Sequence, residues 1–252
     1  MTKIGLGTFV DPRQDGGKLN IRTWEDLVEL IEINNEEWLL YKTFPIDIAF
    51  IRGTTADPNG NISMEKEALT LDNLAIATAA RNSGGIVIAQ VEQVTDTPLS
   101  PRQVEVPGIF VDYVVIAELE NHTQTWVTGF DSAFAGQTRR TMEEAAVMEL
   151  DERKVIARRA AMELAKSVGG IVNLGIGMPE GVSKVAAEEG FINEIHLTAE
   201  PGVIGGMPQG GLDFGAAVNH DALLNQNQQF DFYDGGGLDL ACLLYTSDAA
   251  DE

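Results

Sequence analysis

Glu200 is the residue whose surroundings in this sequence most favour chemistry. It ends a short apolar run and is followed directly by Pro201 and Gly202, with Gly205 and Gly206 close behind. Proline disfavours a helical conformation at the residue before it, so Glu200 is expected at the end of a strand. The glycines remove side chains where a ligand must approach the main chain. Open α/β sheets place their chemistry in such crevices, whereas the alternative is a solvated glutamate on a surface loop.

A second glycine-rich turn precedes Glu200 in the chain. Gly175 and Gly177 separate an apolar run at 171–174 from a helical pattern that begins at Pro179. Main-chain N–H groups at such a turn, with a helix dipole behind them, suit an anion, although a plain strand-to-helix turn is the alternative. The full dinucleotide pattern Gly-x-Gly-x-x-Gly is absent because position 180 is glutamate, and no serine nucleophile elbow is present. Gly175 and Gly177 are therefore candidate ligand-binding residues.

The composition argues against several other classes of function. The formal charge is −22, from 39 acidic and 17 basic residues, whereas a nucleic-acid partner requires a basic surface. Cys242 is the single cysteine and the three histidines are scattered, so neither a disulfide framework nor a metal site is expected. No apolar run reaches the length of about 18 residues that a membrane span needs, and no signal peptide is recognisable. We expect a cytoplasmic protein that binds neither nucleic acid nor membrane.

The first half of the chain predicts parallel α/β winding. Asn34 and Asn35 tolerate positive φ between two alternating runs, which is typical of a β-hairpin. A helical pattern at 69–81 then lies between apolar strands, and strands separated by a helix favour a parallel sheet. The expected strands are 28–33, 37–42, 46–51, 86–91 and 111–117, with a turn-rich loop at 52–61.

The second half repeats the α/β pattern after a polar segment at 131–141, which predicts a domain linker. Asp151 is a suitable N-cap for a helix that runs to about 166, and Gly190 is a suitable C-terminal cap for the helix that begins near Pro179. The other expectations are a strand at 171–174, a strand that delivers Glu200, an inward face formed by Val155, Ala160 and Leu164, and a final strand near 238–241 without a partner.

Two of these glycine-rich segments together resemble one enzyme family. Residues 174–182 (LGIGMPEGV) and 198–206 (TAEPGVIGG) are similar to family I coenzyme A transferases, and more closely to the propionate and acetate CoA-transferase branch. The resemblance covers residues 1–241 and rests on the combination of pieces. Further similar segments are 42–47, 52–57, 106–113, 120–122 and 150–160.

The resemblance implies a fold and a division of the chain. Family members consist of two similar α/β domains with the active site between them. Residues 1–140 resemble the later part of the first domain plus the linker, and residues 141–241 resemble the opening part of the second. Each domain would thus be incomplete here, and we expect this chain by itself to fold poorly or to aggregate.

The resemblance also implies a reaction. The glutamate of the family pattern Glu-x-Gly-x-x-Gly is the nucleophile, which maps onto Glu200 with Gly202 and Gly205 in the glycine positions. CoA would move between a short-chain acyl-CoA and a carboxylate such as acetate or propionate, through an acyl-glutamyl anhydride and a glutamyl-CoA thioester. Coenzyme A is then a substrate, no cofactor or metal is needed, and the full-length enzyme is expected to be a homo-oligomer.

The sequence also predicts several substrate-binding residues, and it leaves two alternative functions open. The candidate substrate-binding residues are the glycines of the two turns: Gly175, Gly177, Gly202, Gly205 and Gly206. A sugar-phosphate isomerase of the same superfamily would work with a general base and without CoA. A truncated CoA-binding module would bind CoA without transferring it.

The last residues differ abruptly from the rest of the chain. Residues 242–252 (CLLYTSDAADE) closely resemble the translation of an adapter used in DNA library preparation. We therefore interpret 242–252 as a non-native read-through tail, with a frayed natural terminus as the alternative.

Overall fold

The computed structural model describes residues 1–141 and 147–243, and the chain divides into two compact units, Met1–Pro45 and Ile46–Glu252. The first unit contains the predicted hairpin, formed by strands β1 (Val28–Ile33) and β2 (Glu36–Tyr41). Asn34 and Asn35 have φ angles of 55° and 62°, as a tight hairpin turn requires. The hairpin prediction is confirmed. The predicted domain boundary at residue 140 is not the boundary at Pro45 between the two compact units, and it stays a prediction.

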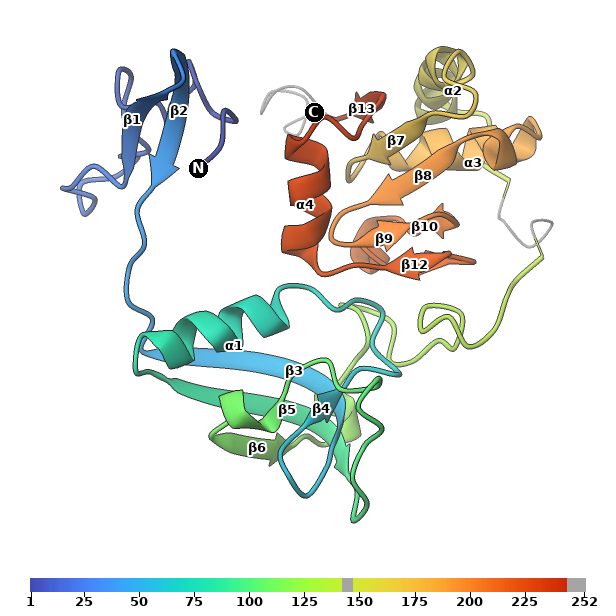
Figure 1. Cartoon of the computed structure of the whole chain (residues 1–252). Coiled ribbons are helices and arrows are strands. Elements are labelled where there is room, and N and C mark those ends of the chain that lie inside the picture. Colours follow the sequence, from blue (N-terminus) through green and yellow to red (C-terminus); the bar gives the residue numbers. More distant parts are fainter. Residues whose placement is uncertain (142–146, 244–252) are drawn as a thin grey trace. The chain divides into compact units, whose positions relative to one another are not determined.

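The second unit begins with a sheet of four strands in the order β4-β3-β5-β6. β3 (Ile48–Ala56), β5 (Ile86–Val94) and β6 (Tyr113–Ile116) run parallel, and the short β4 (Ile62–Ser63) pairs antiparallel with β3. Helix α1 (Asn73–Asn82) lies along one face of this sheet (Figure 1). Ala77 and Ala80 of α1 pack there against alternate strand residues such as Val87 and Ala89. The expected parallel α/β winding is confirmed.

Several predicted boundaries in this part of the chain were wrong, and the two largest errors concern β3 and α1. β3 does not end at residue 51 but continues to Ala56, because Thr54 and Thr55 are buried and the strand keeps its pairing with β5. α1 begins at Asn73, because Leu71 has a φ angle of 52° and cannot belong to a helix. Residues 131–141 form no helix or strand, as expected of a linker, yet Ala133 and Phe134 are buried.

The second sheet has five strands in the order β12-β9-β8-β7-β13. β7 (Ile171–Leu174), β8 (His196–Ala199) and β13 (Leu240–Cys242) are parallel, whereas β9 (Val203–Ile204) and β12 (Ala222–Leu223) complete the sheet in antiparallel pairs. A further short pair joins β10 (Met207–Pro208) to β11 (Ala217–Val218). The final strand was expected to lack a partner. That expectation was wrong, because β13 pairs with β7 and includes Cys242.

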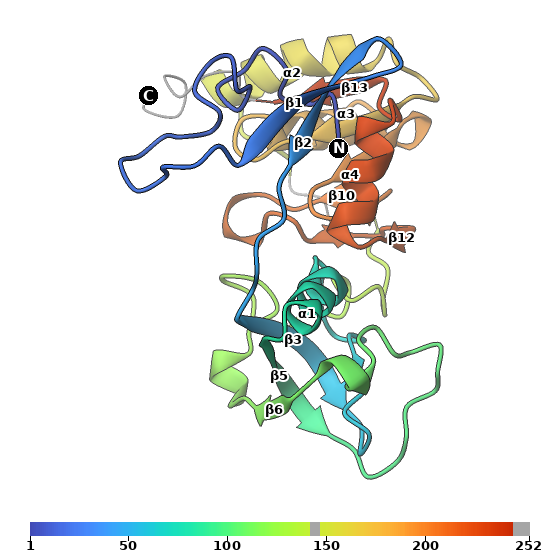
Figure 2. The same ribbon diagram turned by 60° about the vertical axis from the view of Figure 1, so that its left-hand side comes forward.

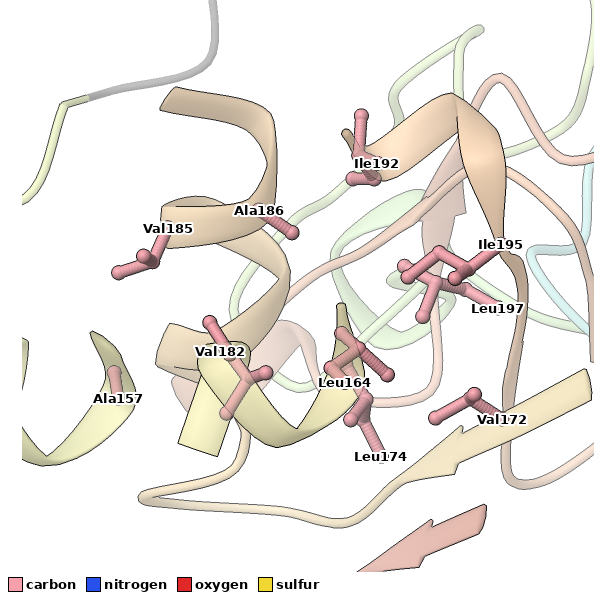
Figure 3. Packing of buried hydrophobic residues seen from close by; sticks show 11 residues of the cluster. Ala157, Leu164, Val172, Leu174, Val182, Val185, Ala186, Ile192, Ile195 and Leu197 are labelled. Atoms are coloured by element: carbon pink, nitrogen blue, oxygen red, sulfur yellow. The ribbon is translucent and has the colours of Figure 1, made fainter. Parts of the chain in front are cut away.

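Two helices cover one face of this second sheet. α2 (Glu152–Leu164) and α3 (Glu180–Glu188) lie side by side in both views (Figure 1, Figure 2). Figure 3 shows their buried side chains gathered against those of β7 and β8. Asp151 is the N-cap of α2, since its carboxylate accepts a hydrogen bond from Lys154 N at 2.9 Å. Gly190 ends the turn after α3 with a φ of 85°.

The predicted inward face of α2 was partly wrong. Val155 is 60% exposed, whereas Ala157, Ala161 and Leu164 are buried. Small residues face the neighbouring helix because the two helices approach closely, and a Cβ on Gly181 of α3 would lie 2.9 Å from Ala157 Cβ. Val155 points elsewhere because it lies two residues, or about 200°, from Ala157 around the helix.

Helix α4 (Gln226–Asp234) contacts the opposite face of the second sheet. Val172 and Leu174 of β7 point toward α2 and α3, so the alternate residue Asn173 points the other way, where Tyr233 of α4 meets it. Within residues 1–141 and 147–243, no helix is long and apolar enough to cross a membrane. Of the tail predicted at 242–252, residues 244–252 lie outside the described residues, so that interpretation stays a prediction.

Candidate active site

Glu200 directly follows β8, at the carboxyl end of the strand, as its sequence context predicts. β7 and β8 are parallel, with Asn173 opposite Thr198, so the Gly175–Gly177 turn and Glu200 leave the same edge of the sheet. The Glu200 side chain is half-buried. Its Oε1 accepts a hydrogen bond from Asn173 Nδ2 at 2.8 Å. A carboxylate is thus presented at the sheet edge and held from one side by a buried amide.

The amide of Asn173 is in turn oriented by two hydroxyl groups. Asn173 is 2% exposed, and its Oδ1 lies 3.3 Å from the Tyr233 hydroxyl and 3.4 Å from Thr198 Oγ1. Each hydroxyl has one hydrogen: that of Tyr233 can go to Thr198 Oγ1 at 2.8 Å or to Asn173 Oδ1, and that of Thr198 to Val172 O at 3.1 Å or to Asn173 Oδ1. Because these groups surround the amide oxygen, the amide nitrogen faces Glu200 and donates to it. The network therefore offers Glu200 a donor, which suits the ionised carboxylate.

Burial and charge keep the Tyr233 hydroxyl protonated. Burial raises the pKa of Tyr233 to about 12, and the nearby Glu200 charge acts in the same direction. The contact with Thr198 opposes this shift but does not cancel it. The Tyr233 hydroxyl, which contacts Thr198 and Asn173 near the Glu200 carboxylate, thus remains a neutral donor over the whole ordinary pH range.

The chain reverses direction immediately after Glu200, and Gly202 is required there. The Glu200–Pro201 peptide is cis, and Gly202 has a φ of 119°. A Cβ at Gly202 would lie 2.2 Å from the carbonyl oxygen of Leu224, so any side chain would collide with backbone. This glycine allows a tight hairpin from β8 into β9, with Glu200 at its tip.

The other glycines after Glu200 lie farther along the hairpin. Gly205 N donates to Leu197 O at 2.7 Å, which places Gly205 beside the middle of β8 rather than beside the carboxylate. Gly205 and Gly206 line a hollow of about 320 Å³, together with His196 and Asp221. The structure thus brings Gly202 next to Glu200, whereas Gly205 and Gly206 belong to the far side of the hairpin.

Most of the candidate main-chain donors are already engaged. Gly202 N donates to Gln229 Oε1 at 2.7 Å, Gly175 N donates to Cys242 O at 2.9 Å, and Gly177 N donates to Glu180 Oε1 at 2.8 Å. These glycines therefore contribute by their small size and backbone angles. A role for them as oxyanion donors would require these contacts to open.

Sequence reasoning missed Asn173, Gln229, Tyr233 and Glu180. Gln229 lies in a polar helix among similar residues, Gln226 and Gln228, and nothing in the sequence distinguishes it. Glu180 was noted only because it breaks the dinucleotide pattern. Its carboxylate instead closes the turn after β7 and also accepts from Gly211 N at 3.1 Å. Among the described residues, no group of three His, Cys, Asp or Glu side chains could hold a metal ion.

Comparison with known proteins relates this chain to one family. Residues 1–117 match the family model described as "Coenzyme A transferase". The chain is 52% identical to caffeate CoA-transferase of Acetobacterium woodii over 96% of its own length, and 44% identical to acetate CoA-transferase YdiF of Escherichia coli K12 over 97%.

A solved structure agrees with these matches. The crystal structure of the acyl-CoA transferase YdiF apoenzyme from Escherichia coli O157:H7 matches 95% of this chain with a TM-score of 0.84 and 43% sequence identity. The chain spans 46% of the two curated relatives and 44% of the solved chain. By sequence and by fold, this chain belongs to the coenzyme A transferase family.

Proposed function

We propose that this chain carries the nucleophile of a CoA-transferase, and that Glu200 is that nucleophile. The observation that carries the proposal is the position of the Glu200 carboxylate, half-buried at a strand end and bound by the Asn173 amide at 2.8 Å. A related enzyme supports it, because acyl-CoA transferase from Escherichia coli O157:H7 has been solved as a "thioester complex with CoA" and is 42% identical to this chain.

The proposed reaction proceeds through covalent intermediates, in two steps that are then reversed with a second carboxylate. The Glu200 carboxylate attacks the thioester carbonyl of an acyl-CoA, the C–S bond breaks, and CoA thiolate leaves behind a mixed anhydride. The thiolate then attacks the glutamyl carbonyl, which releases the acyl group as a free carboxylate and leaves a glutamyl-CoA thioester. A second carboxylate reverses both steps and departs as the new acyl-CoA.

The proposal also covers the substrates and partners. We propose short-chain acyl-CoA esters and carboxylates of the acetate and propionate type, in the cytoplasm, with a homo-oligomer as the working form. The name of one relative supports this choice, whereas another relative is named for caffeate. CoA enters and leaves as a substrate, and none of the steps calls for a metal or a redox cofactor.

The test uses a hybrid enzyme, in which residues 1–241 replace the matching part of the Acetobacterium woodii caffeate CoA-transferase. The hybrid supplies the rest of the relative's length, of which this chain spans 46%. Incubated with propionyl-CoA alone, it should form a thioester on Glu200 that borohydride reduces and hydroxylamine cleaves. With acetate added, it should produce acetyl-CoA, and caffeate in place of acetate measures the acceptor preference.

Glu200→Ala should abolish both the adduct and the transfer, because the segment 198–206 contains no second carboxylate that could form the anhydride. Glu194→Ala is the matched control, since Glu194 is exposed and lies just before β8. Transfer that survives Glu200→Ala, or an adduct on another residue, would remove Glu200 from the mechanism. A folded hybrid that binds CoA without exchange would favour a binding module, and turnover of a sugar phosphate without CoA would favour an isomerase.

A further inference from the structure

The side chain of Gln229 is fully buried and completely hydrogen-bonded to the backbone around Glu200. Its exposed fraction is 0%, and it is the buried residue of α4. Its Oε1 accepts from Gly202 N at 2.7 Å, while its Nε2 donates to Ala199 O at 3.2 Å and to Val203 O at 3.1 Å. A glutamine amide has two donor hydrogens, and both are directed at this hairpin.

These three contacts connect both sides of the Glu200 hairpin. Ala199 is the last residue of β8, Val203 is the first residue of β9, and the two are paired in the antiparallel register. Gly202 belongs to the reversal between them. The Gln229 amide therefore bridges the two strand ends and the turn through hydrogen bonds to three of the five residues in the segment 199–203.

α4 contacts the site at a second point. Tyr233 follows Gln229 by one helical turn, so both side chains project from the same side of α4. The Tyr233 hydroxyl lies within hydrogen-bond distance of Thr198 and of Asn173, and Asn173 donates to the Glu200 carboxylate. One helix thus fixes both the hairpin that carries Glu200 and the side chains that orient its carboxylate.

The burial of this amide is costly unless its partners stay in place. Burying an amide without its hydrogen bonds is unfavourable, and the buried backbone groups opposite it would lose their partners as well. The hairpin therefore has a strong preference for the one geometry that satisfies Gln229.

We propose that Gln229 is a positioning residue of this site, which holds the 199–203 hairpin so that the Glu200 carboxylate remains at Asn173. This inference rests on the proposed function, in which Glu200 is the nucleophile. Gln229 acts on the reaction only through the backbone, and it touches neither substrate nor the reacting atoms.

The first test measures position and does not depend on catalysis. Gln229→Met keeps the length of the side chain but loses all three hydrogen bonds. In the full 252-residue chain, we expect amide hydrogen exchange at Gly202 to accelerate at least about tenfold, with protection in β7 unchanged. Gln228→Met, at the exposed neighbouring position, is the matched control and should leave exchange at Gly202 unchanged.

The second test measures the reaction in the hybrid enzyme. A misplacement of about 1 Å can cost on the order of a hundredfold in rate, so Gln229→Met should lower kcat by about ten- to a hundredfold. The KM for acyl-CoA should change by less than about threefold, because Gln229 does not bind substrate. Gln229→Glu is the second variant: it can still accept from Gly202 N but cannot donate to the two carbonyls, and it should also lower kcat.

The outcomes are distinguishable. Unchanged exchange at Gly202 together with unchanged kcat would overturn the inference. A uniform loss of protection, including β7, would also overturn it, since Gln229 would then be a general core residue. If the unsubstituted hybrid transfers no CoA, the proposed function fails, whereas the exchange measurement still decides whether Gln229 positions the hairpin.

Discussion

At the residue scale, the Glu200 carboxylate depends on a chain of side chains from three elements. Asn173 of β7 donates to it, and Thr198 of β8 and Tyr233 of α4 surround the oxygen of that amide. A carboxylate that is to act as a nucleophile must be correctly oriented, and a fixed amide donor holds it in one orientation. The same network explains why a tyrosine lies so close to an acidic group, since its hydroxyl faces Thr198 and Asn173.

Tyr233 provides a pH-dependent prediction. The pKa of Tyr233 is raised from 10.0 to about 12, so the folded state favours the neutral phenol. Its contribution to stability is therefore complete below pH 10 and is lost as the pH rises to about 12. The tyrosinate absorbance of the chain, minus that of Tyr233→Phe, should show one ionisation near pH 12. Glu200→Gln should move this step to lower pH, because the carboxylate charge opposes the tyrosinate.

Tyr41→Phe is the control for this titration. Tyr41 lies on β2 in the other compact unit, so its replacement should leave the late step in place. If the absorbance difference between the chain and Tyr233→Phe had its midpoint near pH 10, the phenol would be solvated. The hydrogen-bond network of Tyr233, Thr198 and Asn173 would then be incorrect.

The residues of the site differ in how far the sequence reveals them. Glu200 and Gly202 could be predicted, because a proline and glycines after an apolar run constrain the backbone in a recognisable way. Gln229 and Tyr233 could not, because their role depends on contacts between α4 and a hairpin far away in the sequence. Asn173 lies within a correctly predicted strand, but an apolar run with one amide does not indicate what that amide faces.

At the element scale, the sequence predicts what local patterns determine. β7 was predicted with its observed bounds, since Gly169–Gly170 and Gly175 delimit an apolar run. α1 was predicted to begin too early because the conformation of Leu71 is set by tertiary contacts, including its carbonyl, which accepts from Gln226 N. The partner of the last strand was missed because strand order is a property of the sheet.

The turn after β7 gives a prediction at this scale. Glu180 accepts from Gly177 N at 2.8 Å and from Gly211 N at 3.1 Å, so its carboxylate joins two turns. A Cβ at Gly210 would lie 2.4 Å from Glu180 Oε2, so this carboxylate also packs closely against the second turn. In Glu180→Gln, an NH₂ group must face one of the two N–H donors. Because the Gly211 N–H is exposed and can bind water instead, we expect the free energy of unfolding to fall by about 0.5–1.5 kcal/mol.

Chemical denaturation of the full chain measures this change. Glu194→Gln is the matched control, because it makes the same substitution at an exposed side chain outside the turn. Coincident denaturation curves for Glu180→Gln and the parent chain would show that the carboxylate does not hold the two turns together.

At the scale of the whole molecule, the first sheet has one face that α1 covers and one that is largely open. Parallel sheets normally have both faces covered, because their strands are apolar on both sides. Here several apolar side chains on the face away from α1 are exposed. These are Ile48 (53%), Phe50 (75%), Ile86 (43%), Tyr113 (59%) and Val115 (51%).

This open face predicts that the chain by itself associates with further copies of itself. Contiguous exposed apolar surface favours association, and its burial contributes about 25 cal/mol for each Å². Light scattering of the purified 252-residue chain should therefore give an apparent mass above the 27.2 kDa of one copy, increasing with concentration.

Phe50→Lys combined with Val115→Lys should lower that mass, because both charges would have to be desolvated on association. Ile21→Lys, at a 95% exposed position in the other compact unit, is the control and should leave the mass unchanged. A mass of one copy at every concentration would contradict the prediction, since the open face would then be stable in water without a cover.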